Sequence, residues 1–274
     1  MTDFKIDLLN KYTRIRDVHL SAYLSKHKSL LKWKPEAKIA DIGCGTGDLS
    51  YKFIYPQLPK DFSQFVCMDI SRDMLQQAKM RFAGKPKVSF EHLDLTAKVE
   101  EKNKERFDYV FSAYLLMWIA DQRKAFENIY QLLTPGGGCF HVLVNKHPFM
   151  STIFQLVEKS RWKKYVPVRS EMYPFHYATD VDPVGTIKDM MEAIGYVNVK
   201  VFIEDSDFTF HSQEEFLGFF RALPNPLKLM SMEEQNDYLT DAVELAFENK
   251  IIRKNTEKEV NGSLLVVYGE KSDQ

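Results

Sequence analysis

A short glycine-rich segment is the part of the sequence best suited to chemistry. It reads Asp41-Ile42-Gly43-Cys44-Gly45-Thr46-Gly47 and separates a predicted strand from a predicted helix. Glycines let a backbone turn tightly and approach a ligand closely, and the free amides at a helix start attract negative charge. The segment therefore predicts a binding site for a nucleotide-like cofactor.

The spacing of the glycines discriminates between cofactors. A dinucleotide fingerprint requires Gly-x-Gly-x-x-Gly, but Gly47 comes one position early and Asp48 stands where the third glycine belongs. Asp41, at the end of the preceding strand, would repel a diphosphate and attract an amino group. S-adenosylmethionine has an amino acid end and no phosphate. The loop therefore favours this cofactor and disfavours a nicotinamide oxidoreductase.

Two further carboxylates follow the next two predicted strands. Asp69 lies 22 residues after Gly47, where an acidic side chain can accept hydrogen bonds from ribose hydroxyls. Asp94 ends the third strand, in position for the adenine amino group. Either aspartate alone would be interpreted as a helix cap or a surface charge. Together with Asp41 they predict one adenosine-shaped crevice at the carboxyl edge of a sheet.

Strands and helices alternate through the first half of the chain. A helical stretch over residues 4–31 comes first, and Ser71 is a predicted N-cap. The predicted strands cover residues 38–42, 65–69, 88–93, 107–112 and 139–145, with helices over 48–56, 72–82 and 122–133 between them. This alternation predicts an α/β fold, a Rossmann-like parallel sheet with helices on both faces.

The second half is less regular and predicts an insertion into the same domain. Residues 148–177 are rich in aromatic and basic side chains, and Gly195 ends a predicted helix. The predicted elements are helices over 182–194, 213–223 and 233–250, and strands over 196–204 and 263–269. We expect a single domain over residues 1–274. Its parts are a helical lid (1–34), a cofactor-binding core (35–146), substrate-cap segments (147–181 and 206–258) and final sheet elements (182–205 and 259–271).

Composition excludes several classes of function. The 274 residues carry 37 basic and 38 acidic side chains, a net charge of -1, which argues against a nucleic-acid partner. The longest apolar stretch, residues 109–120, is shorter than the roughly 20 residues of a membrane span, so no membrane insertion is expected. Cys44, Cys67 and Cys139 have no metal-ligand spacing. With a charged N-terminus unlike a signal peptide, the sequence indicates a reduced, cytoplasmic protein without a metal site.

The glycine loop and four later motifs carry a family resemblance. DIGCGTGD, CMDIS, HLDL, FDYVFS and LLTPGGG together resemble the class I S-adenosylmethionine-dependent methyltransferases. The resemblance implies a seven-stranded sheet whose last strand is antiparallel, and S-adenosylhomocysteine as product. The residues expected to bind the cofactor are Asp41, Gly43, Cys44, Gly45, Gly47, Asp69, Ile70, Met74, Asp94, Leu95 and Ser112.

A narrower resemblance covers more of the chain. FSAYLLMWI and NIYQLL, with Arg16-Asp17, Trp33 and the PFHY motif at 174–177, resemble the arthropod juvenile hormone acid O-methyltransferases. That family methylates the carboxylate of farnesoic or juvenile hormone acid. Two positions depart from it: Met117 replaces a histidine, and Arg14 replaces a glutamine thought to hold the substrate. The acceptor is therefore open, and a divergent enzyme acting on another acid is possible.

The predicted chemistry needs no catalytic base. A carboxylate with a pKa of about 4 is already ionised near neutral pH, so transfer requires only desolvation and alignment. Arg14 could hold the acid bidentately, and the Trp118 indole could donate one hydrogen bond. Tyr114 and His176 complete the predicted substrate site. The plainer interpretations are a solvent-facing Arg14, a core Trp118 and a structural His176.

Three functions remain open from the sequence. The first is a carboxyl O-methyltransferase for a small apolar acid, favoured by the 13% aromatic content. The second is a methyltransferase for a hydroxyl, phenol or amine, in which His176 would be the base. The third is a non-catalytic protein that binds a small ligand on a methyltransferase scaffold. A monomer or a homodimer is expected.

Overall fold

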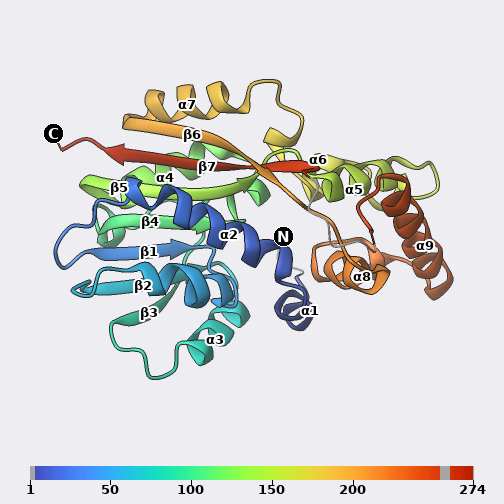
Figure 1. The fold of residues 1–274 in the computed structure, drawn as a ribbon, viewed down its shortest axis with the longest axis horizontal. Helices are drawn as coiled ribbons and strands as arrows, with labels where there is room; N and C mark the ends of the chain where they lie inside the picture. Colours follow the sequence, from blue (N-terminus) through green and yellow to red (C-terminus); the bar gives the residue numbers. More distant parts are fainter. Residues whose placement is uncertain (1–3, 254–259, 274) are drawn as a thin grey trace.

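A seven-stranded sheet forms the centre of the computed structural model, which describes residues 4–253 and 260–273 (Figure 1). The strand order is β3-β2-β1-β4-β5-β7-β6, and only β7 runs antiparallel to its neighbours. The bounds are β1 Lys38–Ile42, β2 Gln64–Asp69, β3 Val88–His92, β4 Phe107–Ala113, β5 Leu133–Val144, β6 Tyr196–Ser206 and β7 Gly262–Lys271. This arrangement confirms the predicted fold class, including the antiparallel last strand.

Helices cover both faces of the sheet. Their bounds are α1 Ile6–Lys11, α2 Arg14–His27, α3 Arg72–Arg81, α4 Gln122–Leu132, α5 Pro148–Glu158, α6 Arg169–Met172, α7 Pro183–Ile194, α8 Gln213–Ala222 and α9 Met232–Glu248. On one face, α2 and α3 bury Leu24 and Ala78 against the sheet. On the other face, α4 and α7 bury Phe126 and Met191. No helix in these ranges is long and apolar enough to span a membrane.

Two predicted helix ends are confirmed by their local geometry. The Ser71 hydroxyl accepts a hydrogen bond from the Met74 N–H at 3.3 Å and caps α3. Gly195 follows α7 with a φ of +117°, a backbone conformation that side chains disfavour. The first of these caps matters for function, because it fixes the start of α3 next to the end of β2.

Three predicted elements differ from the structure. The helix expected over residues 4–31 breaks at Tyr12 and Thr13 into α1 and α2. The turn after the glycine loop includes a π-helical segment, Ser50–Ile54. Residues 148–177 contain α5, which the sequence interpretation missed because its N-cap, His147, is not a usual capping residue.

The insertion between β6 and β7 packs with α5 into a cap beside one end of the sheet (Figure 1). Its centre is aromatic: the Phe149 ring lies 5.8, 5.7 and 5.1 Å from those of Phe210, Phe216 and Phe219. The N-terminal segment joins this cap, since the Lys5 N–H donates to the Ala222 carbonyl at 3.0 Å. The cap and the N-terminus together therefore cover the carboxyl edge of the sheet.

Candidate active site

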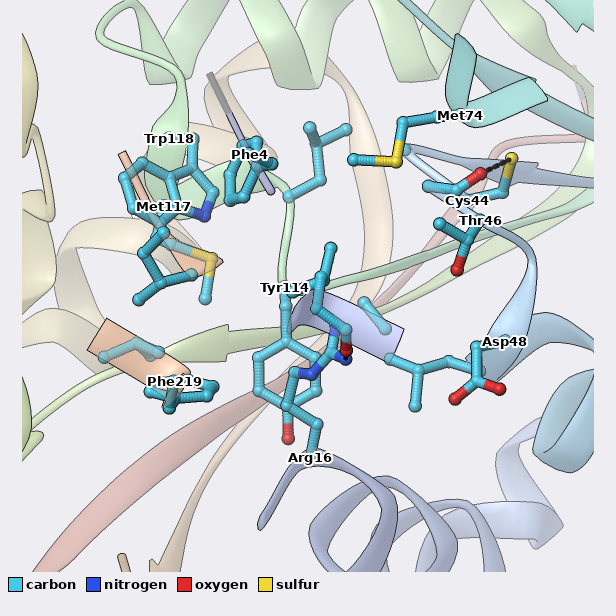
Figure 2. A pocket seen from close by; sticks show the side chains of 18 of the residues that line it. Phe4, Arg16, Cys44, Thr46, Asp48, Met74, Tyr114, Met117, Trp118 and Phe219 are labelled. Carbon is cyan, nitrogen blue, oxygen red and sulfur yellow. Dashed lines mark hydrogen bonds between the residues drawn. The ribbon is translucent and has the colours of Figure 1, made fainter. Parts of the chain in front are cut away.

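A cavity lies at the carboxyl ends of β1, β2 and β4, beneath α1 and the cap (Figure 2). Eight of the residues predicted to bind cofactor or substrate line it: Gly43, Cys44, Gly45, Asp69, Ile70, Met74, Tyr114 and Trp118. The sequence interpretation missed several other lining residues, among them Phe4, Arg16, Asp48 and His147. Phe4 precedes α1 and Arg16 lies on α2, two segments whose approach to the sheet edge has no short-range sequence signal.

The glycine loop forms one floor of this cavity. Gly43, Gly45 and Gly47 have φ values of +75°, +56° and +73°, which explains why glycine stands at these positions. A Cβ on Gly43 would lie 2.6 Å from the Leu115 side chain. A Cβ on Gly45 would meet nothing within 4 Å. The loop thus leaves open space above Gly45 while it packs tightly beneath Gly43.

Asp69 ties the glycine loop to the start of α3. Its Oδ2 accepts the Gly45 N–H at 2.9 Å, and its Oδ1 accepts the Ser71 N–H at 2.8 Å. Burial raises the pKa of Asp69, and these backbone donors oppose that rise. Each carboxylate oxygen has a second lone pair. Because Asp69 lines the cavity, it can also accept hydrogen bonds from ribose hydroxyls.

Asp41 does not line the cavity, so the expectation that it faces the cofactor's amino group is not met. It is only 3% exposed, and its carboxylate accepts a hydrogen bond from the Ser50 hydroxyl beneath the loop. Burial raises the pKa of Asp41 to about 7, while the Ser50 hydroxyl opposes the rise. Asp41 therefore supports the loop from below.

Replacing Asp41 by asparagine should make folding less sensitive to pH. Because the pKa is higher in the folded state, unfolding releases a proton, and wild-type stability falls as pH rises from about 4 to about 7. A shift of about three units corresponds to about 4 kcal/mol. Urea unfolding of both proteins across this range measures their free energies of unfolding. The value for Asp41→Asn minus that for the wild type should grow with pH and then level off. A constant difference would contradict the prediction.

Three other predicted cofactor residues do not line the cavity in the structure. Asp94 accepts hydrogen bonds from its neighbour Thr96, which hold the pKa of its carboxyl low. Leu95 is buried in the core on the α4 side. The Ser112 side chain is buried as well, while its strand neighbour Ala113 lines the cavity. Since strand side chains alternate between faces, Ser112 points away.

Gly47 has a packing role in the structure. A Cβ on this glycine would lie 3.0 Å from the Cβ of Ala78 in α3. The glycine therefore allows the loop to lie close against that helix. This contact, together with the positive φ, accounts for Gly47 without a direct contact to a ligand.

The arginine that reaches the cavity is Arg16 and not the predicted Arg14. Arg14 donates from Nε to Glu215 at 2.8 Å and from Nη2 to the Thr209 carbonyl at 2.7 Å, and it does not line the cavity. Positions two apart on a helix point about 200° apart. Arg16 therefore faces inward where Arg14 faces outward. The expectation that Arg14 lies at the acceptor is not met.

Arg16 is a cation that forms no ion pair inside the described ranges. Its guanidinium donates to the Leu9 carbonyl at 2.9 Å, and its Nε is buried without a hydrogen bond. Burial lowers the pKa of Arg16, against the attraction of Tyr114, Asp17 and Asp48. A buried charge without a counter-ion is unfavourable. Arg16 is consequently ready to bind a carboxylate.

Tyr114 lies beside Arg16 in the cavity (Figure 2). Its φ is +61°, which is unusual for a residue with a side chain, and its hydroxyl is buried without a partner. Its N–H donates to the Val142 carbonyl at 2.9 Å, which holds this conformation at the end of β4. Backbone outliers of this kind are concentrated at functional sites.

The opposite wall of the cavity is aromatic. The Trp118 ring lies edge-on to Phe4 at 5.3 Å and to Phe175 at 4.9 Å, with Met117 beside it (Figure 2). His176 is exposed and lies outside the cavity, because the turn that brings Phe175 inward directs the next side chain outward. The expectation of His176 at the substrate site is therefore not met.

The histidine that lines the cavity is His147. Its Nδ1 accepts the Phe149 N–H at 3.2 Å, and burial lowers the pKa of its ring to about 3. The ring is therefore neutral and carries its proton on Nε2, an assignment made from this hydrogen bond. A histidine in this state can donate a hydrogen bond but cannot accept a proton at Nδ1.

Comparisons with known proteins agree with this geometry. Residues 40–139 match the family model described as a methyltransferase domain. The juvenile hormone acid O-methyltransferase of Bombyx mori is 27% identical over 248 residues, covering 90% of this chain and 87% of the relative. The Drosophila melanogaster protein of the same name is 26% identical over 227 residues, covering 81% and 75%.

A solved structure shares the fold. Haemonchus contortus phosphoethanolamine N-methyltransferase 2, in complex with S-adenosyl-L-methionine, has a TM-score of 0.53 at 19% identity, covering 99% of this chain and 61% of that one. The chain thus carries a methyltransferase domain in the class I fold, for which S-adenosylmethionine is the expected cofactor. Its similarity to the juvenile hormone acid O-methyltransferases extends over most of its length, as the sequence motifs predicted.

The residues at one end of the cavity fit this cofactor. The side-chain-free surface at Gly45 leaves room for it, and Asp69 suits its ribose. The unpaired Arg16 is complementary to the carboxylate of its amino acid end. When bound, S-adenosylmethionine supplies a methyl group that is reactive toward nucleophiles.

Proposed function

We propose that this methyltransferase esterifies the carboxylate of a small apolar acid. The observation that carries the proposal is that, among the residues that the structure describes, the aromatic end of the cavity offers hydrogen-bond donors and no free proton acceptor. His147 is the titratable side chain there, and its Nδ1 is already used by a backbone N–H. A hydroxyl, a phenol or an ammonium group would have to lose a proton first. A carboxylate arrives without one.

The walls of the cavity support an apolar acceptor. Phe4, Met117, Trp118, Phe149, Phe175 and Phe219 surround this end. They favour a hydrocarbon body and exclude water from the nucleophile. The two relatives named juvenile hormone acid O-methyltransferase support an acid as the acceptor as well. Terpenoid acids resembling farnesoic acid and juvenile hormone acid are accordingly the first candidates.

We assign Arg16 to the cofactor's carboxylate rather than to the acceptor. The charge of Arg16 is attracted by Asp48, which directly follows the glycine loop, and we therefore place Arg16 at the cofactor end. The acceptor is then oriented by neutral N–H groups. Neutral donors align a carboxylate while leaving it more nucleophilic than a tight ion pair with arginine would.

Trp118 is one of these donors. Replacing it by phenylalanine removes the indole N–H but keeps an aromatic ring between Phe4 and Phe175. We expect kcat/KM for the acid to fall about tenfold, the effect of losing one hydrogen bond to a charged group. Steady-state kinetics with separate titrations of acid and cofactor check this. An unchanged kcat/KM would assign Trp118 to packing alone.

Label transfer tests the proposed function directly. The protein is incubated with methyl-labelled cofactor and farnesoic, juvenile hormone, fatty, aromatic or dicarboxylic acids. Organic extracts are counted before and after alkaline hydrolysis. Alkali-labile label in the apolar acids supports a methyl ester. Alkali-stable label with alcohols, phenols or amines would contradict the proposal. Tight acid binding without any transfer would favour a ligand-binding protein.

A further inference from the structure

His147 lies where the chain leaves β5 and enters the cap. Its ring stacks on Phe208 with centroids 3.7 Å apart and meets Phe149 edge-on at 5.9 Å. These contacts hold the ring in one orientation against the cavity. His147 is therefore a fixed polar point among apolar side chains such as Val144, Phe149 and Met150.

The free ring nitrogen of His147 has no partner in the described parts of the chain. Nδ1 is used by the Phe149 N–H, which leaves the proton on Nε2. Nε2 makes no hydrogen bond in these ranges. It is also not one of the polar atoms that are fully buried without a partner, so part of its surface is accessible. An N–H donor thus remains accessible at the cavity wall. A hydrocarbon ligand that covered it would leave it unsatisfied at a cost.

The surroundings of His147 disfavour an anion as its partner. The burial that keeps the imidazole uncharged also penalises a carboxylate at this place. Arg16, which forms no ion pair in the described ranges, donates instead to the Leu9 carbonyl on α1. An uncharged oxygen pairs with Nε2–H without this penalty.

We propose that His147 selects acids whose apolar body carries an uncharged hydrogen-bond-accepting oxygen, such as a ketone or an ether. Nε2–H donates to that oxygen while the carboxylate lies at the reacting end. The assignment rests on the proposed function, because it presupposes an acid in the cavity. It makes His147 a specificity-determining residue that takes no part in methyl transfer itself.

His147 has two roles: its Nδ1 caps the start of α5, and its Nε2–H is a donor toward the cavity. Two substitutions separate these roles. In His147→Asn, the amide oxygen can take the place of Nδ1 and keep the cap, but the Nε2 donor is lost. In His147→Gln, the longer amide can place an N–H near Nε2, while the cap is weakened. Thermal unfolding reports the cap, and ligand selectivity reports the donor. His147→Asn should therefore unfold at the higher temperature, and His147→Gln should keep more of the ligand selectivity.

The test uses keto-substituted hexadecanoic acids with the carbonyl at successive carbons, each compared with hexadecanoic acid. Dissociation constants are measured by calorimetry with S-adenosylhomocysteine bound, so the readout does not depend on turnover. We expect the wild type to prefer one narrow range of carbonyl positions by ten- to a hundredfold. His147→Gln should retain most of that preference, and His147→Asn should abolish it.

The outcomes separate this proposal from the proposed function. If the wild type binds hexadecanoic acid but shows no preference for any carbonyl position, the role of His147 is overturned and the acid remains the acceptor. The same holds if His147→Asn keeps the full preference. If His147→Asn weakens all acids equally, Nε2–H binds the carboxylate instead. If no acid binds, both proposals are overturned.

Discussion

Replacing Arg16 by glutamine should weaken S-adenosylmethionine binding about a hundredfold. Within the part of the chain that the structure describes, Arg16 lines the cavity without an ion pair, and its buried Nε makes no hydrogen bond. Removing one partner of a buried charge pair costs about 2–5 kcal/mol, and glutamine restores part of the hydrogen bonding. Calorimetric titration with S-adenosylmethionine and S-adenosylhomocysteine measures the effect.

The chain provides a matched control for this experiment. Arg14→Gln, two positions away on α2, loses a surface ion pair with Glu215 and should leave cofactor affinity within a few fold. Methylthioadenosine, which lacks the amino acid end, should bind wild type and Arg16→Gln equally. A raised KM for the acid with unchanged cofactor affinity would instead place Arg16 at the acceptor.

Replacing Gly43 by alanine should destabilise the protein by about 3 kcal/mol. The new methyl would lie 2.7 Å from Leu115 Cβ, an atom that no rotamer change can move away. The φ of +75° accounts for about 1–2 kcal/mol of this loss, and the steric contact accounts for the rest. For a chain of this size, thermal unfolding should shift by about 6–12 °C. A shift within about 2 °C would contradict the tight packing beneath the loop.

Two other glycines separate the backbone cost of such a substitution from its steric cost. Gly84 has a φ of +78° and nothing within 4 Å of an added Cβ, so Gly84→Ala measures the backbone cost alone. Gly45 has similar freedom but lines the cavity. Gly45→Ala should therefore unfold like Gly84→Ala while losing at least about tenfold in cofactor affinity, because the methyl occupies ligand space.

The sheet was predictable because its signals are local. The strand Lys38–Ile42 and the cap Ser71 each depend on a few neighbouring residues, and both are confirmed. Asp69 was placed correctly at the cavity for the same reason: it ends a strand and precedes a helix. The alternation of side chains along a strand could have shown that Ser112 and Ala113 point to opposite faces of the sheet, so that only one of them faces the cavity.

The rest of the site depends on contacts distant in sequence. Arg14 and Arg16 differ only in the direction each faces, which is set by how α2 lies against β6 and the cap. His147 has no motif, and its state follows from a hydrogen bond within an unpredicted helix turn. Asp41 ends its strand as predicted, yet Ser50 holds it beneath the loop. Tertiary packing decides each of these cases.

The contribution of residues 4–11, which include α1, to the cavity has an evolutionary consequence. Phe4 contacts Trp118 at the acceptor end, and the Leu9 carbonyl accepts a hydrogen bond from Arg16 at the cofactor end. Leu9 is the buried residue within the six residues of α1. Substitutions on this short segment can therefore reshape the acceptor wall at little cost to the sheet. New acceptor preferences would be acquired most readily at the N-terminus, while the cofactor machinery stays intact.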